Sequence, residues 1–193
     1  MFESLRKNIA RHIEITDTEF EIFRGYFHPI SIKKRDFLLK EGAICTFEAF
    51  VTKGCFRIYY TGESGSEQIL YFAIEDWWAT DIDSFMNQVP SILTIEALED
   101  CEVLIISKKD KDNLYNQLPI VEKLFRIMNQ KTLVAFQRRL ISSHGQTADK
   151  RYLEFLEKYP SLEQRITQQQ IAAYLGISHE FLSKIRKKMH KSE

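Results

Sequence analysis

The sequence predicts an α+β protein with a strand-rich barrel, a long central helix and a pair of short helices near its C-terminal end. Three observations carry this prediction. Short runs rich in Ile, Val, Phe, Tyr and Thr, punctuated by glycines, fill residues 30–107. Residues 120–143 contain neither proline nor glycine. Residues 167–188 place apolar side chains at three- and four-residue spacings on both sides of Gly176.

The N-terminal part predicts helices followed by a jelly roll. Apolar residues recur every three or four positions up to Phe27, and Pro29 ends that segment. The stretch RIYYTGESGSEQILYF, residues 57–72, predicts a hairpin with a glycine-containing loop. Several short strands at this spacing are typical of a double-stranded β-helix or jelly-roll barrel.

Helices are predicted for the rest of the chain. A short helix ending before Pro119 precedes a helix of about six turns over residues 120–143. A helix of this length packs either on the barrel or against its copy in a dimer, and its heptad-like apolar spacing favours the dimer. The segment SSHGQT, residues 142–147, is the expected hinge. We therefore expect a barrel domain (1–119), a dimerisation helix with its hinge (120–145) and a C-terminal domain (146–193).

Composition and charge narrow the class of protein. Hydrophobic residues make up 44% and charged residues 28% of the chain, as in ordinary globular proteins. No apolar run reaches the roughly 20 residues that span a bilayer, and the charged N-terminus lacks a secretory signal, so we expect a cytoplasmic protein without membrane contact. Residues 1–145 carry 18 Lys and Arg against 21 Asp and Glu, whereas residues 146–193 carry 9 against 6. A basic end on an acidic body suits a module that binds an anion, although a solvated helix face would give the same balance.

The three cysteines, Cys45, Cys55 and Cys101, form no CxxC or Cys/His cluster. In a cytoplasmic chain they are expected to be buried free thiols, with no metal site.

The segment TQQQIAAYLGISHEFLSKIRKK, residues 167–188, has the pattern of two helices that cross steeply at a tight turn. Ala172 is small where the helices must approach, Gly176 allows a positive φ, and Ser178 can cap the second helix. The residues expected to pack the helices together are Ile171, Leu175, Ile177, Leu182 and Ile185. A helix pair that serves only for packing would not require all of these features at once. The segment therefore predicts a DNA-binding helix-turn-helix.

The second of these helices would be the recognition helix. Its outward N-terminal residues His179 and Glu180, and Lys184 one turn later, are expected to contact base edges, since Glu can accept from cytosine and Lys can donate to guanine. Phosphate contacts, which position the protein without selecting sequence, are expected from Thr167, Gln169, Ser178, Ser183, Lys187 and Lys188.

With EGAICTFEAFVTKGCFRIYY in the barrel, the long helix and ITQQQIAAYLGISHEFLSKIRKK, the chain resembles the cAMP receptor protein/FNR (Crp/Fnr) family of bacterial transcription regulators over nearly its full length. It is most similar to the short members found in Bacteroidetes-type bacteria, and Gly42 and Gly54 match the family's strand-turn glycines. The resemblance implies a cyclic-nucleotide-binding-like β-roll, a dimerising helix and a winged-helix domain. It also implies a homodimer that binds a palindromic operator in double-stranded DNA and recruits or blocks RNA polymerase. Because the sequence stops soon after the second helix, we expect a truncated wing.

The candidate effector site departs from the family pattern. Nucleotide-binding members hold the ribose with a Gly-Glu pair and the cyclic phosphate with an Arg-Ser or Arg-Thr pair, where this chain has Thr80-Asp81 and Ser91-Ile92. On the long helix, Phe136-Gln137 replace the polar pair that meets adenine. A buried phosphate without its arginine is poorly compensated, so we do not expect cyclic AMP in the usual pose. The candidate pocket for another small effector consists of Tyr71, Trp78, Thr80, Asp81, Ser91, Ile92, Phe136 and Gln137, although such aromatic residues are also typical of a core.

Three functions follow from these observations. The first is a dimeric transcriptional regulator whose β-roll senses a small effector other than cyclic AMP. The second is a constitutive DNA-binding protein whose β-roll is only a scaffold without a ligand. The third, an enzyme of the cupin type, needs several histidines on the barrel strands to hold a metal, and residues 30–107 contain none. We therefore expect no catalytic residues and assign no cofactor.

Overall fold

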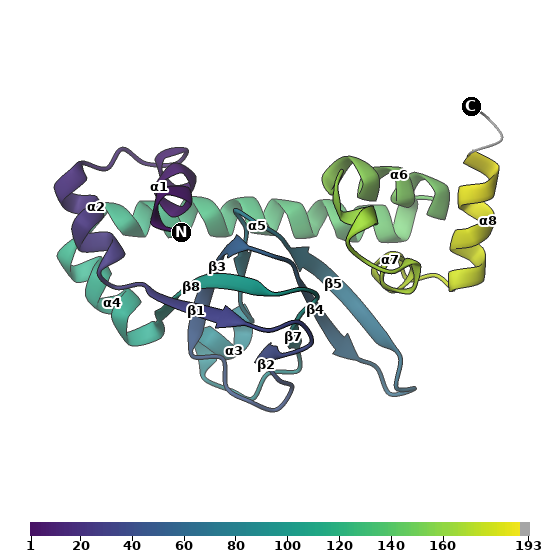
Figure 1. Ribbon diagram of the computed structural model, residues 1–193, viewed down its shortest axis with the longest axis horizontal. Coiled ribbons are helices and arrows are strands. Elements are labelled where there is room, and N and C mark those ends of the chain that lie inside the picture. Colours follow the sequence, from purple (N-terminus) through teal and green to yellow (C-terminus); the bar gives the residue numbers. More distant parts are fainter. Residues whose placement is uncertain (190–193) are drawn as a thin grey trace. The chain divides into compact units, whose positions relative to one another are not determined.

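A computed structural model describes residues 1–189, which form two compact units. The first unit contains residues 1–60 and 71–131. The second contains residues 61–70, which include the tip of a β-hairpin, and the chain from Thr132 onward. Figure 1 shows the order of the elements along the chain.

The strand-rich region folds into two four-stranded sheets (Figure 1), with strand orders β1-β8-β3-β6 and β2-β7-β4-β5. The pairs β1–β8, β3–β8, β3–β6, β2–β7 and β4–β7 are antiparallel. The strands are β1 (His28–Ile32), β2 (Phe37–Leu39), β3 (Phe47–Lys53), β4 (Phe56–Thr61), β5 (Glu67–Ala73), β6 (Trp78–Ala79), β7 (Thr94–Ala97) and β8 (Cys101–Ser107). The predicted combination of helices with a strand-rich domain is confirmed, the strands form an antiparallel sandwich of two sheets, and β4 and β5 form the predicted hairpin.

The two faces of β3 and β8 pack into different cores because successive side chains of a strand point in opposite directions. Ala49, Val51 and Val103 face the interior between the sheets, together with buried residues of β4 and β7. Phe50 and Leu104 face the other way and pack against apolar residues of the surrounding helices. The barrel is therefore filled on the inside and covered on one outer face.

The helices of the first unit are α1 (Phe2–Ala10), α2 (Asp17–Arg24), α3 (Ile82–Asn87), α4 (Lys108–Gln117) and the first part of α5 (Ile120–Gly145). Pro29 lies in β1 rather than after a helix end, and β1 is an edge strand, where a missing N–H donor is tolerated. The predicted long helix is present and continues to Gly145. Only Gln146 and Thr147 separate α5 from the next helix, so the segment of residues 142–147 expected to be a hinge is mostly helical.

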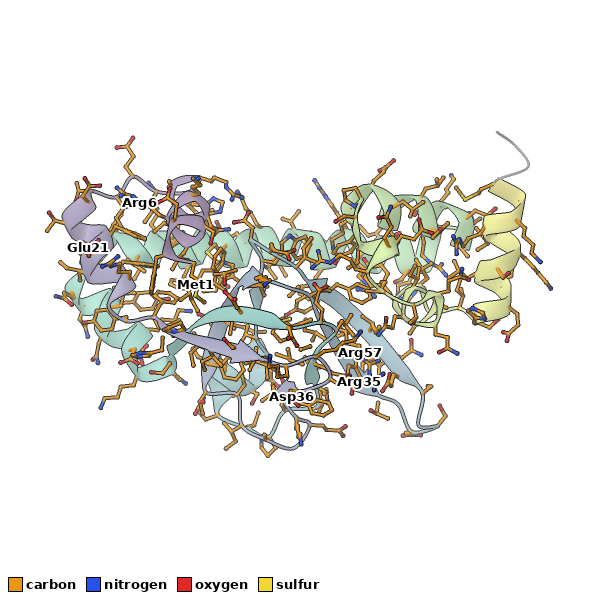
Figure 2. All side chains as sticks on the ribbon, viewed as in Figure 1. Met1, Arg6, Glu21, Arg35, Asp36 and Arg57 are labelled. Carbon is orange, nitrogen blue, oxygen red and sulfur yellow. The ribbon has the colours of Figure 1, made fainter. Side chains whose placement is uncertain are left out.

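Two local features fix the turn between β3 and β4 and its surroundings. Gly54 has φ +95°, and a Cβ at this position would lie 2.5 Å from Cys101 Sγ and 2.9 Å from Cys101 Cα, so no larger residue fits. Arg57 of β4, labelled in Figure 2, pairs with Glu96 of β7 at 2.6 Å, with both side chains largely buried.

Burial raises the pKa of the Cys101 thiol to about 11. As predicted, all three cysteines are buried and free.

The second unit contains the remainder of α5 and four further helical segments, which end in a pair of helices joined by a three-residue turn. These segments are α6 (Ala148–Lys158), the 3₁₀ turn η1 (Leu162–Gln164), α7 (Gln168–Leu175) and α8 (His179–Met189). Its core includes a group of tilted and edge-on aromatic rings from Phe155, Tyr159 and Tyr174.

Candidate nucleic-acid interface and effector cassette

Local capping defines the ends of α7 and the start of α8. Thr167 and Gln170 form a capping box at the start of α7, with each side chain bonded to the other residue's backbone N–H. Gly176 ends α7 in the left-handed region at φ +66°, as its position in the sequence predicted. The Phe181 backbone N–H donates to Ser178 Oγ at 3.2 Å, which is the predicted cap of α8.

Apolar contacts hold the two helices together. The predicted packing residues Ile171, Ala172, Leu175, Leu182 and Ile185 are buried, and Ile177 in the turn is half-buried. This packing leaves the opposite face of α8 open to solvent.

Two arginines that sequence reasoning missed support the end of α7. Arg139 Nη2 on α5 donates to the carbonyl of Tyr174 at 3.0 Å and to that of Ile69 at 2.8 Å. Arg151 Nη2 on α6 donates to the carbonyl of Leu175 at 3.2 Å. These donors satisfy carbonyls at the C-terminal end of α7 that have no partner within the helix. Nothing in the local sequence distinguishes them from ordinary surface arginines.

The residues predicted to contact base edges share the outward surface of α8. His179, Glu180 and Lys184 are all exposed. Of the predicted phosphate-contacting residues, Thr167, Gln169, Ser178, Lys187 and Lys188 are exposed and Ser183 is half-buried. We call the exposed residues of these two groups the α8 face; they are Thr167, Gln169, Ser178, His179, Glu180, Lys184, Lys187 and Lys188.

The charges of the α8 face are not equivalent. Hydrogen bonds from its own backbone N–H and from the Ser178 hydroxyl lower the pKa of the Glu180 carboxyl, which keeps that side chain an acceptor at neutral pH. Lys188 pairs with Asp149 of α6 at 2.9 Å, and Arg186 pairs with Glu163 at 3.2 Å. Within residues 1–189, Lys184 and Lys187 form no ion pair within 4.0 Å, although the charge of Lys184 also acts on Glu180, so both ammonium groups can meet an anion.

The candidate effector cassette consists of Thr80, Asp81, Ser91 and Ile92. Its polar side chains Asp81 and Ser91 form hydrogen bonds with each other and with nearby backbone groups. Asp81 caps α3 by accepting from the backbone N–H groups of Asp83 and Ser84. Ser91 Oγ donates to Asp81 Oδ2 at 2.6 Å and accepts from the backbone N–H of Leu93 at 2.9 Å. Asp81 and Ser91 are both buried. The Ser91 hydroxyl, at the position where the family pattern has the phosphate-binding arginine, is therefore already engaged by a buried carboxylate.

Thr80 of this cassette lies beside Tyr71. Thr80 Oγ1 donates to the carbonyl of Phe47 at 3.0 Å, and the Tyr71 hydroxyl donates to the carbonyl of Thr80 at 3.1 Å. Burial raises the pKa of Tyr71 to about 12, so the phenol stays protonated and acts as a donor. The structure thus brings together Tyr71, Thr80, Asp81 and Ser91 among the predicted pocket residues.

The other four predicted pocket residues are Trp78 and Ile92, which have other surroundings in the first unit, and Phe136 and Gln137, which belong to the second unit. Trp78 packs outside the barrel against Phe50 and Phe125, with ring centroids 5.3 and 5.7 Å away, because strand alternation turns it from the interior that Ala79 faces. Ile92 is 72% exposed. Phe136 and Gln137 are exposed on the part of α5 that belongs to the second unit.

Two features are absent from residues 1–189, the part of the chain that the structure describes. No group of three or more His, Cys, Asp or Glu side chains there is arranged to hold a metal ion. No helix there is both long enough and apolar enough to cross a membrane.

The sequence was compared with models of protein families and with curated proteins. Residues 29–117 match the model of the cyclic nucleotide-binding domain. No curated protein sequence matches the chain.

Several solved structures share the fold across most of the chain. The regulator CLP of Xanthomonas campestris, described as responsive to c-di-GMP, has 16% identity and a TM-score of 0.75, and the alignment covers 92% of this chain and 93% of that one. FixK2 of Bradyrhizobium japonicum has 18% identity and a TM-score of 0.74, with 86% and 85% covered. The catabolite activator protein of Thermus thermophilus has 20% identity and a TM-score of 0.58, with 92% and 85% covered.

These matches give residues 29–117 the sequence pattern of a cyclic nucleotide-binding domain. They also confirm the resemblance inferred from the sequence, because the chain has the fold of transcription regulators of the cAMP receptor protein/FNR family.

Proposed function

We propose that this protein is a DNA-binding transcriptional regulator in which α7 and α8 form the helix-turn-helix. The α8 face carries the proposal, because one helix, capped and packed from behind, presents an ionised acceptor, Glu180, and two lysines that form no ion pair within 4.0 Å among residues 1–189. In this proposal α8 enters the major groove. Glu180 accepts from a cytosine amino group, Lys184 donates to guanine, and His179 contacts a neighbouring base edge.

The remaining polar residues of the α8 face bind phosphates in this proposal. Lys187 has no carboxylate partner among the described residues, whereas Lys188 must first leave Asp149. That surface ion pair, with side chains 75% and 38% exposed, is worth at most about 1 kcal/mol, so a phosphate can replace it.

We further propose that the protein acts as a homodimer on a palindromic site and that the C-terminal half of α5 forms the dimer contact. Five large apolar side chains are exposed along this part of the helix: Leu133, Val134, Phe136, Leu140 and Ile141. Such a stripe is unfavourable in water and suits a partner helix.

Contact with RNA polymerase is also part of the proposal. So is the division into a barrel domain (1–119), a dimerisation helix with its hinge (120–145) and a C-terminal domain (146–193). Residues 190–193 of the C-terminal domain lie outside the described residues.

A small effector other than cyclic AMP remains our first proposal for the β-roll. The Asp81–Ser91 hydrogen bond favours the alternative, a scaffold without a ligand, because a phosphate placed there would have to displace a buried carboxylate from its donor. The two proposals differ in thermal unfolding. A saturable increase in Tm with one small molecule supports an effector, and constitutive DNA binding without any such shift supports the scaffold.

DNA binding is tested with the purified full chain and a library of random duplexes at low salt. We expect repeated selection to enrich a palindromic sequence and binding to weaken steeply as salt is added. A protein that enriches no sequence and binds no duplex at low salt, with or without cell extract, would refute the proposal.

A further inference from the structure

One large aromatic side chain on α8 has no place in the packing of the helix pair. Phe181 is 47% exposed, whereas its apolar neighbours on the same helix, Leu182 and Ile185, are 0% and 3% exposed and pack against α7. A single exposed apolar residue is common on protein surfaces, so exposure alone assigns no role.

The position of Phe181 on the helix is more informative. Its backbone N–H donates to the capping Ser178, which places it in the first turn of α8. Lys184 is three residues further on, so the two side chains lie on neighbouring parts of the helix surface. Glu180 directly precedes Phe181. The ring therefore lies in the N-terminal part of α8, where a recognition helix approaches base edges.

The chemistry of the ring limits what it can contact there. A phenyl group has no hydrogen-bond donor or acceptor, so it can bind neither a phosphate nor the polar edge of a base. The major groove offers one apolar group, the C5 methyl of thymine.

We propose that Phe181 packs on a thymine methyl and is a further specificity-determining residue of α8, in addition to the residues of the α8 face. The inference rests on the proposed function, because it requires that α8 enters the major groove. It adds that each half-site contains a thymine next to the bases contacted by Glu180 and Lys184.

The expected effect follows from the removal of one methyl group from water. Burying one such group changes binding about fourfold, so a site with one contact in each half is expected to change about fifteenfold. A duplex in which uracil replaces thymine tests this directly, since uracil lacks only the methyl group.

The experiment begins with the sequence that the full chain enriches from random duplexes. Each thymine of the half-site is then replaced by uracil, in symmetric pairs, and Kd is measured by fluorescence anisotropy. We expect one position to lose about fifteenfold in affinity with the natural sequence. For Phe181→Ala, thymine and uracil duplexes should bind equally at that position, whereas Phe181→Leu should keep part of the difference.

Matched controls separate this inference from the proposed function. Lys187→Ala should weaken binding to both duplexes alike and leave their ratio unchanged, because phosphate contacts carry no base information. Circular dichroism confirms that each variant retains its helices. If no duplex binds, the proposed function fails. If DNA binds but the site lacks thymine, no uracil substitution matters, or Phe181→Ala keeps the full thymine–uracil ratio, this inference alone is overturned.

Discussion

Lys187 of the α8 face leads to a quantitative prediction about how DNA affinity depends on salt concentration. Lys187 is exposed and has no carboxylate partner within the described residues, so in the proposed complex it is expected to neutralise one phosphate per protomer. Replacing it with alanine removes two phosphate contacts from a dimer and none of the residues that pack α8 against α7.

The magnitude follows from counterion release. Each phosphate contact contributes about 0.9 to the slope of log K against log salt concentration, so Lys187→Ala should flatten that slope by about 1.8. Between about 50 and 200 mM salt, the variant should therefore lose about tenfold less affinity than the unaltered protein. Binding should also weaken for every sequence by a similar factor, since the contact is not to a base.

Anisotropy titrations at several salt concentrations, on the enriched duplex and on an unrelated one, measure this change. Asp149→Ala is a matched control, because it releases Lys188 from its ion pair without removing a positive charge, and it should strengthen binding modestly. A slope unchanged by Lys187→Ala, or an effect confined to one DNA sequence, would refute the assignment of Lys187 to a phosphate.

Three further outcomes are expected. Lys184→Ala should change which bases are enriched from random duplexes; a variant that enriches the original sequence unchanged would contradict its role at a base edge. Ser91→Ala should lower the free energy of unfolding by about 1–3 kcal/mol, measured by urea denaturation, because it leaves the buried Asp81 carboxylate without its hydroxyl donor; an unchanged midpoint would contradict this. Although Lys158 is exposed as a whole, its ammonium lies 5.1 Å from the centroid of the Tyr159 ring, and desolvation there, followed by the charge of Arg139, lowers its pKa to about 8 in the folded protein, below its ordinary value of 10.5. The unfolded chain therefore binds more protons between these values, and the stability advantage of Lys158→Met at pH 7 should shrink as the pH rises above about 8; a pH-independent difference between the two proteins would refute this assignment.

Features that depend on near neighbours in the chain were predictable. The β4–β5 hairpin, the long helix, the capped start of α8 and the positive φ of Gly176 all follow from residues within one turn or one strand of each other. Such signals survive because capping and backbone geometry act locally.

Features that depend on which face meets which neighbour were not. Trp78 was predicted to line an effector pocket, yet it packs toward the helices, whereas its neighbour Trp77 packs toward the barrel interior. Strand alternation was the signal that could have separated them. The exposure of Phe181 had a weaker signal, namely an aromatic residue at a position that the packing of two crossing helices does not require.

The sequence by itself determined the order of the elements and the residues that cap and pack α7 against α8. Tertiary structure decided what those residues do with one another. It joined Asp81 to Ser91, paired Lys188 with Asp149, and placed Lys111 Nζ 2.5 Å from Glu48 Oε2, a buried pair separated by 63 positions in the chain. Polar and charged groups take whatever partner the fold brings within hydrogen-bond distance, and burial makes that choice costly to reverse. The fold therefore decides which charges of this protein remain available to an anionic partner.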